Sequence, residues 1–158
     1  MHLGDSIDEY DHGGYASQRA AELGRLSEPD AGLLTLAHYR RRHAQYRSDP
    51  DLQALTARVP LIAVRDGHEI ANNAWRNGAE NHQPATEGDW AARRAAAIRA
   101  YDEWLPIREV PPRRPERICR GFEFGTLLSL HMRKTYTATV GNTLRTLPGS
   151  GNRRVLPA

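Results

Sequence analysis

Two short clusters of titratable side chains could carry chemistry in this sequence, and the first lies at its start. In GDSIDEY, Asp5 and Asp8 stand three residues apart, Gly4 precedes the first of them and Glu9 follows the second. Two carboxylates at this spacing in a turn can converge on one hard cation, and a preceding glycine lets the chain turn tightly. The cluster therefore predicts metal binding by Asp5 and Asp8.

The second cluster is RDGHE at residues 65–69, which supplies Asp66, His68 and Glu69. A histidine close to metal ions can donate a proton to a leaving oxygen or stabilise charge on a phosphoryl group. Each motif is short and occurs often by chance, and a polar loop after a core strand is the alternative interpretation. Taken together, the two clusters favour a metal-dependent hydrolase.

Two strands are expected to position these clusters. The apolar run Leu61–Val64 predicts a buried strand that ends at the second cluster, and His2 and Leu3 predict the end of another strand. Proteins of the α/β class tend to place their chemistry where strands leave the sheet, so we expect Asp5 and His68 to lie side by side. Because strands usually run about five or six residues, we also expect upstream sequence to belong with His2.

Helices are expected before and after the second cluster. Apolar residues recur at helical spacing over 31–46, with Arg40–Arg42 expected on solvated faces and His43 on a partly covered stripe. A second helix is expected from the cap at Asp49 to Pro60. A third is expected over 86–105, with acidic residues in its first turn. Its core-facing stripe comprises Trp90, Ala97, Tyr101 and Trp104.

The remaining segments complete the predicted architecture. Residues 65–88 form a long polar loop, and loops of that length are usually functional or disordered. ERICRGFEFGTLLSLHM at 116–132 alternates around Gly125 and predicts two strands or a hairpin. After Lys134 the periodicity is lost, and we expect a disordered tail. This order of strands and helices predicts the α/β class, helix-rich and without an internal repeat.

The totals fit one domain or a piece of one. The 158 residues are 39% hydrophobic and 26% charged, and no apolar run approaches the roughly 18 residues of a membrane span. The N-terminus has neither a basic start nor an apolar segment, so as written nothing directs export and a cytoplasmic chain is expected. Cys119 is the only cysteine, and we expect it in the core rather than in a disulfide or a thiolate metal site.

The two parts of the chain carry opposite charge. Residues 1–105 hold 12 Arg against 16 acidic residues, a net charge of −4, whereas residues 106–158 hold 9 Arg and 1 Lys against 3 acidic residues, a net charge of +7. The basic residues are not interleaved with aromatic ones, so nucleic-acid binding is not expected. A basic interaction module stays as an alternative, and salt-dependent binding to DNA would be its test.

Both clusters and the sequence around them resemble the alkaline phosphatase D (PhoD-like) family of the metallophosphoesterase (calcineurin-like) superfamily. Family members typically read HLGDYIYEY and later WDDHExxNNxW, and this chain has HLGDSIDEY at 2–10 and VRDGHEIANNAW at 64–75. The resemblance continues through YRRRHAQYRSDPDLQAL, NGAENHQPATEGDWAARRAAAIRAYDEWLPIRE and RICRGFEFGTLLSLHM, and so covers residues 2–132. A match of this length is much more specific than two short motifs.

This resemblance implies a four-layer sandwich of helices and sheets around a two-metal centre of iron and calcium. It implies hydrolysis of phosphate monoesters and diesters, in a family whose members are typically exported. Asp5 would bridge the metal ions, Asp8 would stand at another ligand position, and His68 would donate the proton. Three further residues would shape the loop or bind the substrate: Asp66, Asn72 and Asn73.

Three positions depart from the family pattern. The family's tyrosine ligand is Asp8 here, its aspartate before the histidine is Gly67, and its tryptophan is Arg65. Asp8 can still bind a hard metal, whereas Gly67 has no side chain with which to ligate, so one ligand is expected to be lost. We expect residues 1–132 to form a partial metallophosphoesterase domain and residues 133–158 a divergent tail. A change of reading frame would explain the divergence, and the coding DNA read in all three frames would test it.

Three functions are consistent with this sequence. The first is a PhoD-like alkaline phosphatase acting on a phosphate ester, in a truncated form; the second is a catalytically inactive fragment of that family; the third is the basic interaction module. A two-metal site usually needs roughly six or more protein ligands, and this chain offers about two to four. On that count we expect little or no activity from the chain alone. The sequence does not give the particular ester, the metal or the oligomeric state.

Overall fold

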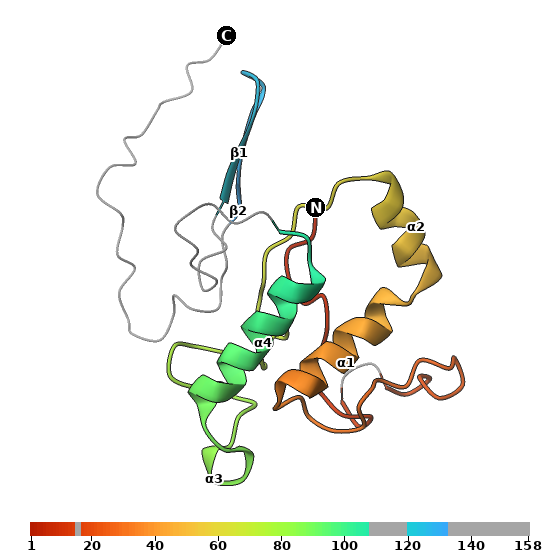
Figure 1. The fold of residues 1–158 in the computed structure, drawn as a ribbon, viewed down its shortest axis with the longest axis vertical. Coiled ribbons are helices and arrows are strands. Elements are labelled where there is room, and N and C mark those ends of the chain that lie inside the picture. Colours follow the sequence, from red (N-terminus) through yellow and green to blue (C-terminus); the bar gives the residue numbers. More distant parts are fainter. Residues whose placement is uncertain (15–16, 108–119, 133–158) are drawn as a thin grey trace.

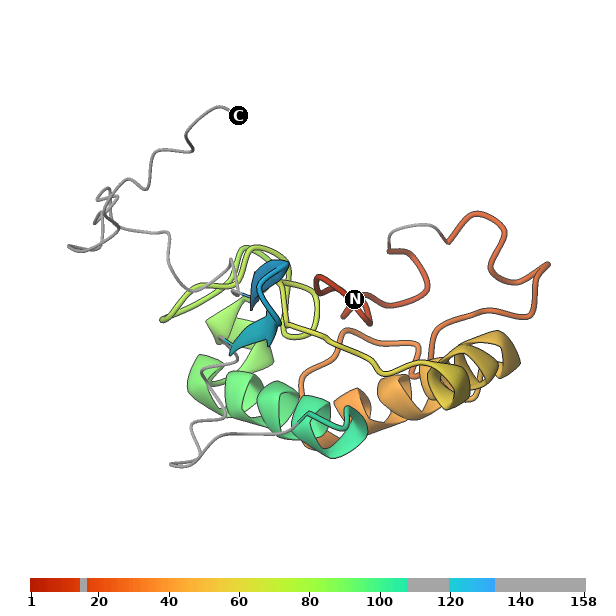
Figure 2. The ribbon, with the colours of Figure 1, turned by 90° about the horizontal axis from the view of Figure 1, so that it is seen from above.

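The computed structural model describes residues 1–14, 17–107 and 120–132. Two long helices, α1 (Leu36–Arg47) and α4 (Trp90–Trp104), pack against each other and form the base of the molecule. Figures 1 and 2 show these helices side by side, with the loops that connect the elements on one side of them. The remaining elements are α2 (Pro50–Arg58), the short α3 (Pro84–Glu87), β1 (Arg120–Phe124) and β2 (Leu128–Met132).

The three predicted helices are confirmed, but the first begins at Leu36 and not near Ala31, and the third at Trp90 and not at Thr86. Side-chain caps set where they begin. Thr35, Asp49 and Asp89 each accept a hydrogen bond from a backbone N–H in the first turn of α1, α2 and α4 respectively. The expectation of acidic residues in the first turn of α4 is wrong, because Asp89 is the cap itself and Glu87 ends α3.

The core lies between the two long helices and the loop that precedes α4. The predicted stripe on α4 is confirmed for three residues that are at most 7% exposed, namely Trp90, Ala97 and Tyr101, while Trp104 is partly buried. The loop at 65–88 is less polar in structure than its composition predicts, because Ile70, Ala71, Ala74 and Ala79 are buried in the same core. Their spacing follows neither a helix nor a strand, so no periodic pattern revealed them.

The predicted strand at Leu61–Val64 is wrong as a strand. Within the described residues this segment makes one isolated parallel bridge, in which His2 N donates to Ile62 O at 2.8 Å and Val64 N donates to His2 O at 3.2 Å. A strand needs a longer run of paired residues, and the segment beside it pairs here only at His2. The bridge nevertheless pairs the two segments that lead into the clusters, and Asp5 and His68 lie side by side as expected.

The predicted hairpin is confirmed. β1 and β2 pair antiparallel with Phe122 opposite Leu130, and Gly125 takes a left-handed φ of 58° at the turn. One contact ties the hairpin to the bridge, since Arg120 Nη2 donates to Ala63 O at 2.7 Å. The described residues thus form a helix-rich mixed fold in which parallel pairing is limited to one bridge and the sheet is this two-stranded one.

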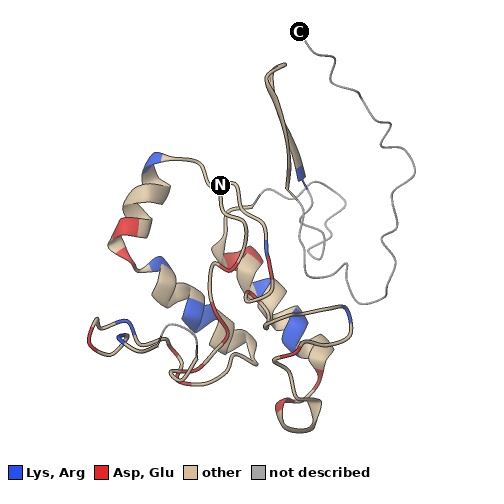
Figure 3. Ribbon diagram, turned by 180° about the vertical axis from the view of Figure 1, so that it is seen from behind, with Lys and Arg blue, Asp and Glu red and all other residues tan. Residues whose placement is uncertain are grey.

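The expectation of solvated faces for Arg40–Arg42 is wrong for its last member. Arg42 is 1% exposed, whereas Arg41 is exposed and pairs with Glu28. Figure 3 shows basic residues on both long helices. Arg42 on α1 and Arg93 on α4 are the ones that are buried, and both donate hydrogen bonds to loop backbone. Buried guanidinium groups with carbonyl partners connect helices to loops, a role that sequence spacing cannot reveal.

His43 gives the fold a testable dependence on pH. The side chain is 1% exposed, and burial, with Arg47 nearby, lowers its pKa from 6.5 to about 4. Between about pH 6.5 and pH 4, His43 therefore takes up a proton in the unfolded chain but stays neutral in the folded chain. Acidification in this range favours unfolding. The stability that neutral His43 contributes is complete above about pH 6.5 and declines toward pH 4.

We expect His43→Leu to become more stable relative to wild type as the pH falls from 7 to 4, by up to about 3 kcal/mol. Urea denaturation at several pH values measures the difference. Parallel dependence of both proteins on pH would contradict it.

Among the described residues, no helix is both long and apolar enough to cross a membrane. The expectations for Cys119 and for the tail at 133–158 fall outside the described residues.

Candidate functional site

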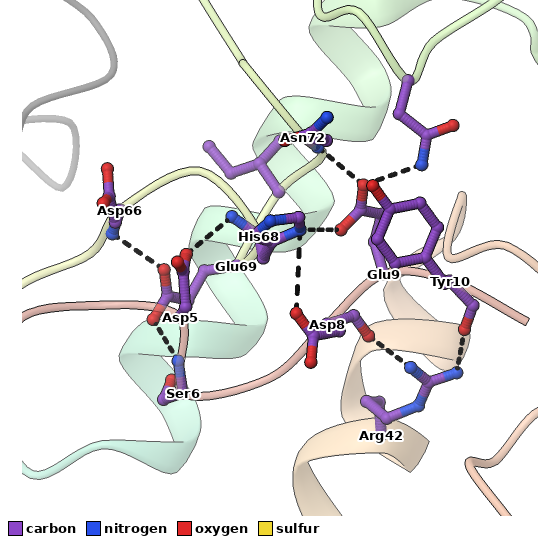
Figure 4. Close-up of polar contacts among 12 residues, drawn as sticks. Asp5, Ser6, Asp8, Glu9, Tyr10, Arg42, Asp66, His68, Glu69 and Asn72 are labelled. Atoms are coloured by element: carbon purple, nitrogen blue, oxygen red, sulfur yellow. Dashed lines mark hydrogen bonds and ion pairs between the residues drawn. The ribbon is translucent and has the colours of Figure 1, made fainter. Parts of the chain in front are cut away.

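The two clusters come together, as the sequence predicts. The backbone N–H of His68 donates to Asp5 Oδ1 at 3.0 Å, across 63 positions of sequence. Figure 4 shows both clusters facing each other above the long helices. Asp5 is held with a left-handed φ of 54°, and Gly4 before it has φ 115°. A Cβ on Gly4 would lie 2.4 Å from Asp66 Cβ, so only glycine permits this close approach of the two loops.

A buried carboxylate from the second cluster reaches back to the first. Glu69 is fully buried and accepts hydrogen bonds from the backbone N–H of Ser6 at 2.7 Å and of Asp66 at 2.8 Å. Asp5 therefore binds the second loop while Glu69 binds the first. Since a buried carboxylate is stable only when it is hydrogen-bonded, these contacts fix the separation of the two loops.

Glu9 is the centre of the site. It is fully buried, and its carboxylate accepts hydrogen bonds from three parts of the chain. His68 Nδ1 lies 2.8 Å from Oε2, while the backbone N–H of Asn72 at 2.6 Å and Nδ2 of Asn81 at 2.7 Å both reach Oε1. The contacts of Glu9 with His68 and Asn72 are drawn in Figure 4.

These contacts set the charge of His68. The hydrogen bond to Glu9 raises the pKa of His68 to about 9, against the opposing effect of burial and with help from the charges of Asp5 and Asp8. Burial disfavours the ionised form of Glu9, but the hydrogen bonds from His68, Asn81 and Asn72 outweigh it and lower the pKa. At neutral pH the pair is an imidazolium beside a carboxylate.

Asp8 stands beside this pair rather than within it. Its Oδ1 lies 3.7 Å from His68 Nδ1, beyond hydrogen-bonding distance, and burial raises its pKa. Arg42 on helix α1 fixes the backbone around Asp8, because it donates to the carbonyl of Asp8 and, at 2.8 Å, to that of Tyr10. The ring of Tyr10 lies 5.6 Å from that of His68, centroid to centroid.

The three other predicted residues lie in the second loop, and each makes a different contact there. Asn72 contributes its backbone N–H to Glu9, and Asp66 contributes its own to Glu69. Asn73 has a left-handed φ of 50°, and its side chain donates to Glu80. These contacts are those of residues that shape a loop; a contact with substrate stays a prediction for all three.

Sequence reasoning did not single out Glu9, Asn81 or Arg93. Arg93 is 2% exposed; its Nη1 donates to Asn81 O at 2.8 Å and its Nε donates to the hydroxyl of Tyr39 at 3.2 Å. Glu9 lies next to Asp8 in the sequence, but no local pattern shows that its side chain is buried. Asn81 and Arg93 carry no local signal, because they act on Glu9 from another loop and another helix.

The described residues supply only part of the ligands of a metal centre. Among the described residues, no three His, Cys, Asp or Glu side chains are grouped so that they could hold a metal ion. Position 67 has room for a side chain larger than that of glycine. A Cβ there would lie 3.6 Å from Asn73 N and 3.7 Å from Ala71 O, which are ordinary contact distances. Asp5 and Asp8 alone do not fit a complete two-metal centre.

Comparisons with known proteins identify the family of this chain. The family model described as PhoD-like phosphatase matches residues 1–146. Alkaline phosphatase D of Bacillus subtilis (strain 168) is 37% identical over 137 residues, which are 85% of this chain and 23% of that protein. The solved structure described as "Structure of PhoD" matches with a TM-score of 0.70 and 39% identity, over 82% of this chain and 24% of that one. The chain thus spans about a quarter of the length of these relatives. It belongs to the PhoD-like phosphatase family.

Proposed function

We propose that this chain supplies the proton donor and two of the metal ligands of a metal-dependent phosphate ester hydrolase, acting on monoesters or diesters. The observation that carries the proposal is the contact of His68 with both Asp5 and Glu9, which joins the two sequence clusters into one site. Family membership supports the reaction class, because the relatives are described as phosphatases.

In this proposal His68 protonates the leaving oxygen of the ester. Its Nδ1 is bound to Glu9, so Nε2 is the ring nitrogen that can give a proton to a ligand. With a pKa of about 9 the ring holds that proton at neutral pH, as a general acid requires. Its side chain is 23% exposed, which leaves it accessible from solvent.

The negative charge of the site indicates that a cation must bind before the substrate can bind. The carboxylates of Asp5, Asp8 and Glu9 all act on His68, and Arg42 acts on Asp8 and Glu9. The imidazolium and this guanidinium together do not neutralise three carboxylates. A phosphate ester is itself anionic, so this group repels it unless a cation offsets the charge. Asp5 and Asp8 would be the ligands that this chain gives to the metal ions, which the family resemblance identifies as iron and calcium.

Hydrolysis of p-nitrophenyl phosphate by the purified chain, with and without added iron and calcium, tests the function. Because the described residues offer only part of the ligands of a two-metal centre, we expect little hydrolysis. What there is should require the metals, be lost with a chelator and return when metal is restored. Asp5→Ala should weaken metal binding, measured by calorimetry, together with the rate. Hydrolysis no faster than in buffer containing the same metals would overturn the proposal, as would a rate that Asp5→Ala leaves unchanged.

A further inference from the structure

We infer that Glu9 is the positioning residue for His68: its buried carboxylate fixes which ring nitrogen faces the substrate. This inference rests on the proposed function for its catalytic meaning. Its geometric part stands on the contacts of Glu9 alone.

Glu9 is suited to this role because it is itself fixed on all sides. Its side chain is fully buried, and Asn72 N and Asn81 Nδ2 both bind Oε1, which leaves Oε2 for His68 Nδ1 at 2.8 Å. A carboxylate whose other oxygen already has two donors cannot turn to follow the ring. The imidazole must therefore adapt to the carboxylate.

The support of Glu9 extends to helix α4. Asn81, which binds Glu9, is held through its carbonyl by Nη1 of Arg93 at 2.8 Å. Arg93 also donates to the hydroxyl of Tyr39 on α1, and that hydroxyl donates to Ile70 O at 2.5 Å, two residues before Asn72. Side chains from both long helices thus support the Glu9 carboxylate, which binds the ring of His68.

The chemical consequence is a fixed proton arrangement on the ring. With a carboxylate opposite, Nδ1 must carry a hydrogen, and Nε2 is the nitrogen left to act on a ligand. In Glu9→Gln the amide nitrogen can face the ring and donate to Nδ1, which then becomes an acceptor. The variant changes a single atom of Glu9 and is expected to lose the Nδ1–H hydrogen bond.

Nitrogen-15 NMR of the imidazole rings tests this without substrate. In the wild type we expect an Nδ1–H resonance of His68 that is protected from solvent exchange, and its loss in Glu9→Gln. Glu69→Gln is the matched control, since it alters an equally buried carboxylate that binds the backbone N–H groups of Ser6 and Asp66 in the same loops. The control should lose stability but keep the resonance.

In kinetics, Glu9→Gln should lower kcat for p-nitrophenyl phosphate about 10- to 100-fold and leave KM and metal affinity unchanged. A resonance that persists in the Glu9→Gln variant, or that is missing from the wild type, would overturn the inference. If the wild type shows the resonance but no turnover, the proposed function fails while the positioning by Glu9 stands. If Glu9→Gln does not fold, the exchange protection measured in the wild type still decides.

Discussion

Replacement of His68 by glutamine is expected to lower the metal-dependent hydrolysis of p-nitrophenyl phosphate about 10²-fold or more. A positioned general acid contributes about 10² to 10⁴ in rate, and glutamine has no proton to transfer at neutral pH. The contact between the loops should survive, because Asp5 binds the backbone N–H of residue 68 and not its ring. Metal affinity should therefore stay near the wild-type value while kcat falls.

A matched control separates loss of a proton donor from general damage to the loops. His12 lies in the same N-terminal segment, and its ring contacts Ser27 O at 2.8 Å and Asp30 at 3.2 Å, away from Glu9. His12→Gln should retain the rate to within about twofold, since it removes polar contacts that lie away from His68 and Glu9. Equal rates for His68→Gln and wild type would remove His68 from the mechanism, whatever the control shows.

Replacement of Arg42 by methionine is expected to destabilise the chain by about 3 kcal/mol or more. The guanidinium donates to the carbonyls of Glu28 at 2.8 Å, of Tyr10 at 2.8 Å and of Pro29 at 3.2 Å, as well as to that of Asp8. Methionine fills the space of the stem but leaves buried carbonyls without donors, at a cost of roughly 1–3 kcal/mol each where water cannot reach them. Urea denaturation followed by circular dichroism measures the loss.

The neighbouring arginine is the control for this prediction. Arg41 pairs with Glu28 at 2.8 Å, but both side chains are more than half exposed. Arg41→Met should cost under about 1 kcal/mol, as exposed ion pairs generally do. Similar losses for the two variants would show that burial of Arg42 does not set its contribution. Because Arg42 holds the turn that carries Asp8, its loss should also lower metal binding.

Local sequence determined the elements to within a few residues. Thr35, Asp49 and Asp89 begin their helices because a capping side chain needs only the next three residues to act. Gly125 turns the hairpin for the same kind of reason, since a left-handed φ is a property of one residue. Where the signal had to come from a partner, prediction failed: the run Leu61–Val64 has β-forming residues but forms one bridge.

The candidate site divides in the same way. The two clusters could be read directly from the sequence, because they are runs of neighbouring residues. The family followed from the resemblance of residues 2–132 to known members, and the meeting of the clusters was expected because each follows an apolar segment. Only the tertiary structure decided that Glu9 is buried and accepts from His68, and that Arg42 and Arg93 hold its surroundings from the two helices. A charge can lie in the interior only when its partners come from elsewhere in the chain. Burial and pairing across more than fifty positions are therefore properties of the folded molecule and not of any one segment.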